Sequence, residues 1–191
     1  MPAKTLPIVP FKTAKAMTAW MEKHHQKSPG IWLRFFKKDS GKASVNPKDA
    51  IDVALCYGWI DSQGKKHDVE SWLIKYTPRK PRGLWSKRNI ERVALMIEQK
   101  RMRPAGLSQV ESAKADGRWA AAYDKPSDMK VPEDFLAALK KDKKAFAFFQ
   151  TLNKANTYAI AWRLQTAKKP ETRERRMKVL LEMLKNGEKI H

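Results

Sequence analysis

The stretch YTPRKPRGLWSKRNIE, residues 76–91, carries the chain from a segment of strand character into one of helical periodicity. Two prolines, a glycine and a tryptophan share its sixteen positions with five basic residues. Ser86 is expected to cap the helix by accepting from a backbone N–H two or three positions later, and Trp85 can pack on Ile90 as a hydrophobic staple. Asn89 stands where a capping box needs Glu or Gln, which leaves its amide available to a ligand.

Other local patterns predict the elements on either side of this stretch. Apolar residues at i, i+3, i+4 and i+7 predict a helix over residues 87–102. A helix is also predicted over residues 12–26, where Ala16, Ala19, Trp20 and Lys23 fall at helical spacing. The remaining predictions are strands at 31–36, 59–61 and 70–77, a turn at 62–65, and helices over 47–57 and from Ser108 to Gly117. Asn46 is expected to cap the helix over 47–57, with Pro47 at its first position.

The segment YDKPSDMKVPED, residues 123–134, combines prolines with polar residues and predicts a domain boundary. Only helical patterns follow it; the last runs from Pro170 to Asn186-Gly187. We therefore predict an α+β protein. A small mixed α/β domain with a short antiparallel sheet covers residues 1–125, and a helical domain covers residues 130–191.

Composition restricts the class of protein. The 191 residues include 40 Lys and Arg against 20 Asp and Glu, a formal net charge of +20. A hydrophobic fraction of 42% excludes a disordered basic tail. Cys56, the one cysteine, lies in the apolar stretch ALCYGW and is expected to be a buried, inert thiol. Because neither a signal peptide nor a run of about 20 apolar residues is visible, we expect a cytoplasmic protein without a membrane span.

The sequence contains no pattern for a metal or nucleotide cofactor. His24 and His25 are adjacent, so on a helix they point about 100° apart, and the chain has no H-x-x-x-H and no cysteine pair. It also lacks G-x-G-x-x-G and the Walker sequence. We therefore expect neither metal nor cofactor.

The densest positive charge lies around the opening stretch. Residues 75–103 contain ten basic residues and two acidic ones, a net charge of +8. Arg79 and Arg82 precede a helix N-terminus, whose free N–H groups and dipole favour an anion. A base could stack on an exposed tryptophan. The candidate anion-binding residues are Arg79, Arg82, Trp85, Arg88 and Asn89; the alternative is a structural loop with solvated arginines.

Asp61, in the segment GWIDSQGKKHD, is the weak candidate for catalysis. Its carboxylate could act as a general base, pair with Arg79, or cap the following turn. The two structural roles are the more common for an aspartate in this position. Ser62 lacks a nucleophile motif, because GWIDS is not the G-x-S-x-G elbow.

Four segments together resemble the bacterial YdeI/OmpD-associated family of bacteriocin protection. They are LCYGWIDSQ, YTPRKPRGLWSKRN, GLSQVESAKADGRW and AKKPETRERRMKVLLEMLKNG, and the resemblance runs from about Gly30 onward. The family's recognisable elements correspond to residues 58–61, 77–79, Trp85, Ser86 and Asn89. The resemblance implies a helical C-terminal domain and an association with stress protection, but no settled enzymatic activity.

These observations lead to three hypotheses. The first is a non-enzymatic, stress-related protein that binds an anionic partner, with nucleic acid as the leading candidate. The alternative is an enzyme for a small anionic, for example phosphorylated, metabolite, with Asp61 as base, Arg79 as anchor and Asn89 as positioning residue. The third is an interaction protein whose C-terminal helices dock a partner.

Overall fold

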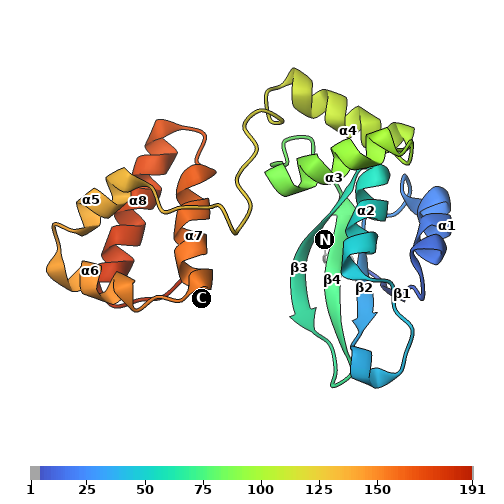
Figure 1. Cartoon of the computed structure of the whole chain (residues 1–191), viewed down its shortest axis with the longest axis horizontal. Helices are drawn as coiled ribbons and strands as arrows, with labels where there is room; N and C mark the ends of the chain where they lie inside the picture. Colours follow the sequence, from blue (N-terminus) through green and yellow to red (C-terminus); the bar gives the residue numbers. More distant parts are fainter. Residues whose placement is uncertain (1–4, 191) are drawn as a thin grey trace. The chain divides into compact units, whose positions relative to one another are not determined.

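A computed structural model describes residues 5–190. The chain divides into two compact units, Met1–Ala122 and Tyr123–His191. The first unit combines a four-stranded sheet with helices, and the elements described in the second are all helices. This organisation, drawn in Figure 1, confirms the predicted α+β class with helices in the C-terminal part.

The sheet of the first unit has the strand order β1-β2-β4-β3. The three longer strands pair in antiparallel fashion, as predicted, whereas β1 joins β2 in parallel and makes the sheet mixed. β1 was not predicted, because a three-residue segment that follows Pro7 and ends in Pro10 offers few backbone donors. The strands are β1 (Ile8–Pro10), β2 (Ile31–Phe36), β3 (Trp59–Lys66) and β4 (Ser71–Pro78).

β3 is longer than predicted. The turn expected at residues 62–65 is wrong, because β3 continues through this segment with a shift of register between Asp61 and Gly64. The chain reverses instead at residues 67–70. A bulge lets an edge strand absorb polar residues and glycine without ending. Asp61 therefore lies within the sheet, opposite Tyr76, and does not cap a turn.

Helix α2 (Pro47–Cys56) forms the centre of the first unit and packs on the sheet and on three other helices. Asn46 caps it by accepting from the backbone N–H of Lys48 at 2.8 Å, and Pro47 takes its first position, as predicted. Six of its ten residues are buried. Cys56 is one of them, as expected for an inert thiol.

Helix α1 (Ala14–His24) buries residues other than those noted for their helical spacing in the sequence. Its buried residues are Met17 and Met21, whereas Ala16 and Ala19 are exposed. The methionines lie four residues apart and so share one face of the helix. Because they carry more apolar surface than alanine, they determine which face is buried.

Two more helices, α3 (Lys87–Glu98) and α4 (Pro104–Ala115), complete the first unit together with the short 3₁₀ helix η1 (Lys38–Ser40). α3 begins at Lys87 as predicted but ends at Glu98, four residues before the expected end at residue 102. The start expected for α4 at Ser108 is wrong, because Pro104 already takes the first position of the helix. Gly106 therefore lies inside α4.

Gly106 allows α4 to approach α2 closely. A Cβ atom at this position would lie 2.3 Å from the carbonyl oxygen of Cys56 and 2.7 Å from that of Leu55. These oxygens belong to the backbone of α2 and cannot swing aside as the end of a side chain can. The contact between the two helices therefore requires glycine here.

The second unit has its own apolar core. Its helices are α5 (Glu133–Leu139), α6 (Lys143–Gln150), α7 (Lys154–Gln165) and α8 (Pro170–Lys185). α8 begins at the proline that the sequence indicated and ends before Asn186-Gly187, as predicted. The core consists of Phe135, Leu139, Ala145, Ile160, Leu164, Leu180 and Leu184.

We expect Gly106→Ala to lower the free energy of unfolding by about 1–3 kcal/mol, because the new methyl group overlaps the backbone of α2. In an unconstrained helix the same change would stabilise the protein. Gly64→Ala is the matched control, since its Cβ would meet its nearest neighbour at 3.8 Å. Urea unfolding of both variants checks this, and equal midpoints would contradict the role of Gly106.

Candidate functional site

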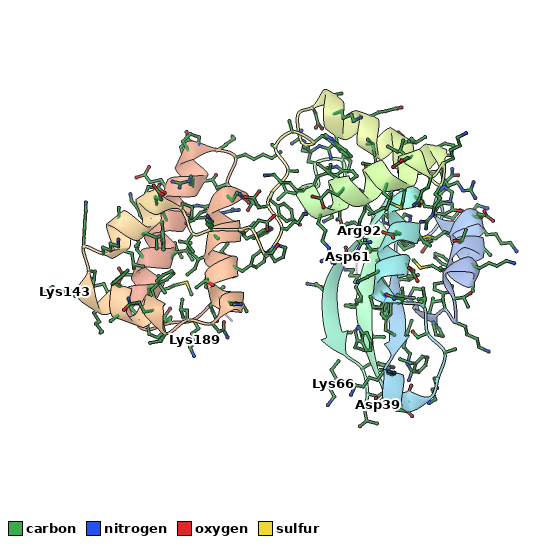
Figure 2. All side chains as sticks on the ribbon, in the orientation of Figure 1. Asp39, Asp61, Lys66, Arg92, Lys143 and Lys189 are labelled. Atoms are coloured by element: carbon green, nitrogen blue, oxygen red, sulfur yellow. The ribbon has the colours of Figure 1, made fainter. Side chains whose placement is uncertain are left out.

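A recess of about 220 Å³ opens in the first unit, where the first turns of α2 and α3 meet the sheet. We call it the α2–α3 recess. Figure 2 labels two of its residues, Asp61 on β3 and Arg92 on α3, which lie close together. The complete lining is Pro47, Lys48, Ile51, Asp61, Ile74, Tyr76, Arg88, Asn89 and Arg92.

The sheet supplies one wall of the α2–α3 recess. Asp61 and Tyr76 are direct partners in the antiparallel register, so their side chains lie on the same face. Ile74, two residues before Tyr76 on β4, lines the same recess. Tyr76 is only 1% exposed and joins the recess to the core. The register of β3 on β4 therefore determines which polar groups enter the recess.

Two helix N-termini supply the opposite wall. Asn46 and Ser86 cap α2 and α3 by accepting from the backbone N–H groups of Lys48 and Asn89, at 2.8 and 3.2 Å. The cap predicted at Ser86 is thereby confirmed. The positive ends of both helix dipoles meet at the recess, beside the side chains of Lys48 and Arg88. This arrangement favours an anion.

Asp61 and Tyr76 titrate abnormally in this environment. Asp61 is an exposed residue, but desolvation of its carboxyl group raises the pKa. A backbone hydrogen bond and then the positive charges of Arg79, Arg88 and Arg92 oppose the rise. Burial, and then the neighbouring carboxylate, raise the pKa of Tyr76. Asp61 therefore holds a proton more readily than an ordinary aspartate does.

Arg92 contributes charge to the recess but is already engaged. Its Nη1 atom donates to Asp52 Oδ1 at 2.5 Å and to the backbone carbonyl of Lys48 at 3.3 Å. The arginine thus ties α3 to α2. Its role is to hold the two helix N-termini together.

The structure brings some of the predicted site residues together and separates others. Arg88 and Asn89 line the α2–α3 recess together with Asp61. Arg79 and Trp85 are buried outside its lining, with 7% and 2% of their surface exposed. The stacking of a base on Trp85 is therefore wrong, because the Arg79 guanidinium lies 3.6 Å from the centre of its ring and Trp119 packs against it.

Arg82 lies in the exposed part of the loop between β4 and α3 and does not line the recess. The loop around it is held by other residues. Gly83 donates its backbone N–H to the carbonyl of Lys80 at 2.9 Å, and Arg118 donates to the carbonyl of Gly83 at 3.2 Å. Arg118 is 4% exposed and fixes this loop to the end of α4.

Six lining residues were not among the predicted site residues: Pro47, Lys48, Ile51, Ile74, Tyr76 and Arg92. Lys48 and Pro47 stand at the start of a helix that was predicted correctly, so the argument for anion binding at Ser86 applied equally to Asn46. Tyr76 carried no such signal. It enters the recess through its pairing with Asp61, and single-sequence patterns do not reveal strand register.

The fold and the recess define an α+β domain with a candidate anion site, followed by a helical domain. Residues 9–109 match the family of a domain of unknown function, DUF8412. Since this match covers more than half of the chain, the protein belongs to that family. The α2–α3 recess lies entirely within the matched residues.

Residues 128–187 match the family described as bacteriocin-protection, YdeI or OmpD-associated. This match confirms the resemblance stated from the sequence and places it in the second unit. The resemblance was expected to extend from about Gly30, but residues 58–61 and 77–89 fall within the DUF8412 match. The chain matches no curated protein and no solved structure.

Residues 5–190 contain neither a helix that could span a membrane nor a cluster of metal ligands. None of the helices described is long and apolar enough to cross a membrane. No group of three or more His, Cys, Asp or Glu side chains within this range is arranged to hold a metal ion.

We expect Arg79→Ala to lower the free energy of unfolding by about 2 kcal/mol, because it removes a desolvated cation–π contact with Trp85. It also removes the hydrogen bond from Arg79 to the carbonyl of Leu84 at 3.2 Å. Arg82→Ala is the matched control and should change stability by no more than about 0.5 kcal/mol. Urea unfolding separates the two, and equal effects would show that Arg79 does not anchor the loop.

We expect Asp61→Asn to stabilise the protein at neutral pH. A raised pKa means that the folded state binds the proton more tightly than the unfolded chain, so the ionised carboxylate costs stability above the folded-state pKa. That cost shrinks as the pH falls through this pKa and is gone below the ordinary value of 3.8. The advantage of Asp61→Asn should therefore decrease with acidification, as measured by urea unfolding across this range.

Asp68→Asn provides a control of opposite sign. Hydrogen bonds from the hydroxyl of Ser71 and the backbone of Glu70, together with the charge of Arg34, hold the pKa of Asp68 below its ordinary value. Its carboxylate therefore stabilises the fold at neutral pH, and its removal should destabilise it. If both variants shifted stability in the same direction, the environment inferred for Asp61 would be wrong.

Proposed function

We propose that the α2–α3 recess binds a small anionic metabolite. The observation that carries this proposal is the meeting of two capped helix N-termini at one recess that also contains Lys48, Arg88 and Asn89. The positive ends of the two helix dipoles and the cationic side chains there favour the same anionic group. The volume of about 220 Å³ is smaller than the 300–1,000 Å³ of sites for drug-sized molecules, which favours a small ligand.

The cationic side chains of the recess differ in whether another residue already engages them. Arg92 is held by Asp52, whereas no hydrogen bond or ion pair within residues 5–190 engages the side chains of Lys48 and Arg88. Arg88 and Lys48 are both exposed at the rim. They are the groups that can close on a phosphate or carboxylate. Arg88 offers a planar fork that binds either group in bidentate fashion.

Asp61 restricts the ligand further. A carboxylate beside an anion site repels the ligand unless it is protonated or accepts a hydrogen bond from a second group of the same ligand. A metabolite with an anionic group and a neighbouring hydroxyl or amino group can bind Arg88 through the first and donate a hydrogen bond to Asp61 through the second. Sugar phosphates and hydroxycarboxylates have this combination.

Proton transfer by Asp61 is the second candidate function. A carboxyl group with a raised pKa can serve in general acid–base catalysis, and Asp61 lies beside the position proposed for the ligand. An enzyme of this kind would use Arg88 and Asn89 to hold the anion. Arg79, the anchor expected from the sequence, is replaced in this role by Arg88 because Arg79 is buried under Trp85.

Nucleic-acid binding remains the competing hypothesis for the same basic segment. The net charge of +8 over residues 75–103 supports it, but the burial of Trp85 removes the aromatic platform on which it partly depended. Arg82 and Arg88 would then act together as phosphate contacts on an open surface. A small-anion site requires Arg88 but not Arg82, whereas an open nucleic-acid surface would use both arginines.

We expect Arg88→Ala to weaken the binding of a small anion about tenfold or more, because one charge-assisted hydrogen bond contributes roughly 1.5–3 kcal/mol. Arg82→Ala is the matched control, an exposed arginine of the same segment outside the recess, and should leave the affinity unchanged. Isothermal titration with inorganic phosphate, a sugar phosphate and a hydroxycarboxylate measures the effect.

Short DNA and RNA duplexes and single strands form the second arm of this experiment, at low and physiological salt. Nucleic-acid binding that falls steeply with salt and weakens equally in both variants would favour an open phosphate-binding surface. Such a result, together with no binding of the small anions, would overturn the proposal. Turnover that is lost in Asp61→Asn, with ligand affinity retained, would establish the catalytic candidate.

A further inference from the structure

The second unit contains a larger groove, which the proposed function does not use. It has a volume of about 500 Å³ and lies between α7 and α8. We call it the α7–α8 groove. Its lining is Trp162, Arg163, Arg175, Arg176, Val179, Leu180, Met183 and Ile190.

The surface of the α7–α8 groove is apolar. Leu180 belongs to the buried core, and Trp162 and Met183 are half-buried. Val179 is 55% exposed, although it lies next to the core residue Leu180 on α8. An apolar side chain that borders a groove and remains open to solvent gains from being covered by a ligand.

The basic residues of the groove have different roles. Arg176 donates from Nη1 to the carbonyl of Arg163 at 2.6 Å and to Thr166 Oγ1 at 3.2 Å, so it fixes the end of α7 to α8. No hydrogen bond or ion pair among residues 5–190 engages the guanidinium groups of Arg163 and Arg175. None of the described lining residues is acidic. Two open cations therefore border an apolar surface.

The lining residues of α8 form a continuous stripe. Arg175, Val179 and Met183 follow each other at intervals of four residues, so they lie on one face of the helix. Eight residues at 1.5 Å each give the stripe a length of about 12 Å. Its cationic end lies towards the start of α8 and its apolar end towards the C-terminus of the helix. A partner helix of about two turns has the same length.

We propose that the α7–α8 groove binds an amphipathic, acidic helical segment of a partner protein. The apolar side chains of this segment cover Trp162, Val179 and Met183, and its carboxylates pair with Arg163 and Arg175. Binding of a helix along a groove between two helices is an established mode of peptide recognition. The groove supplies both the apolar contact and the complementary charge that this mode requires.

The chemistry of the groove favours a peptide over a polynucleotide. A nucleic-acid backbone would use the two arginines but would leave the aliphatic surface of Val179, Leu180 and Met183 uncovered. An acidic peptide uses both. The inference is independent of the α2–α3 recess, because all residues of the groove belong to the second unit.

The test uses the full chain and a fluorescent peptide of Leu and Glu, with leucines at i, i+4 and i+7 and glutamates elsewhere. Fluorescence anisotropy measures its affinity. A second peptide with Ser in place of Leu retains the charge, and a third with Lys in place of Glu retains the apolar face. We expect the first peptide to bind at least about tenfold more tightly than either control.

Two variants locate the binding site. Arg175→Glu reverses one open cation, and Val179→Asp places a charge on the apolar stripe; each should weaken the first peptide about tenfold or more. Lys178→Glu is the matched control, since Lys178 is an exposed lysine of α8 outside the groove lining. Circular dichroism of all three variants confirms that α8 remains folded.

Three results would overturn the proposal. The first is equal affinity for the Leu and Ser peptides, which would mean that the net charge of the chain alone attracts acidic peptides. The second is an equal effect of Arg175→Glu and Lys178→Glu. The third is displacement of the peptide by a short single-stranded DNA whose own affinity does not change in Val179→Asp. This would identify a phosphate-binding surface.

Discussion

Arg79 holds together the parts of the first unit on which the candidate site depends. Its backbone N–H donates to the carbonyl of Gly58 at 2.9 Å, directly before β3 begins, and its guanidinium stacks on Trp85 directly before the cap of α3. One residue therefore links the start of one edge strand to the loop that leads into a helix. Because α3 starts at a fixed point above the sheet, Arg88 and Asn89 reach the same recess as Asp61.

Several arginines of this protein stabilise the fold through hydrogen bonds to other residues. Arg118 fixes the loop before α3, and Arg92 joins α2 to α3. Arg34 anchors the β3–β4 turn, and Arg176 ties α7 to α8. A guanidinium can do this because its fork of donors reaches carbonyls and carboxylates at once. A net charge of +20 is thus a poor guide to a binding surface. The cations without such partners among the described residues are more informative, because they alone are free to meet a ligand.

The two candidate surfaces lie in different units of the chain and in segments that match different families. The α2–α3 recess falls within the DUF8412 match, and the α7–α8 groove lies almost entirely within the bacteriocin-protection match. Their chemistry differs as well: the recess is small and combines helix N-termini with a carboxylate, whereas the groove is long, apolar and bordered by arginines. The proposed small-molecule site and the proposed peptide groove therefore lie in separate units.

The sequence by itself determined the α+β class, the helical C-terminal part, and the caps at Asn46 and Ser86. These features depend on local periodicity and on side chains that bond to their own backbone neighbours, so a single sequence contains them. Only the tertiary structure decided that Trp85 is covered by Arg79 and that Asp61 faces Tyr76. Both facts depend on strand register and on long-range packing, in which a shift of one residue moves every side chain to the other face. The same stretch of basic residues could have been an open surface, and its packing on the sheet made part of it a wall of a recess.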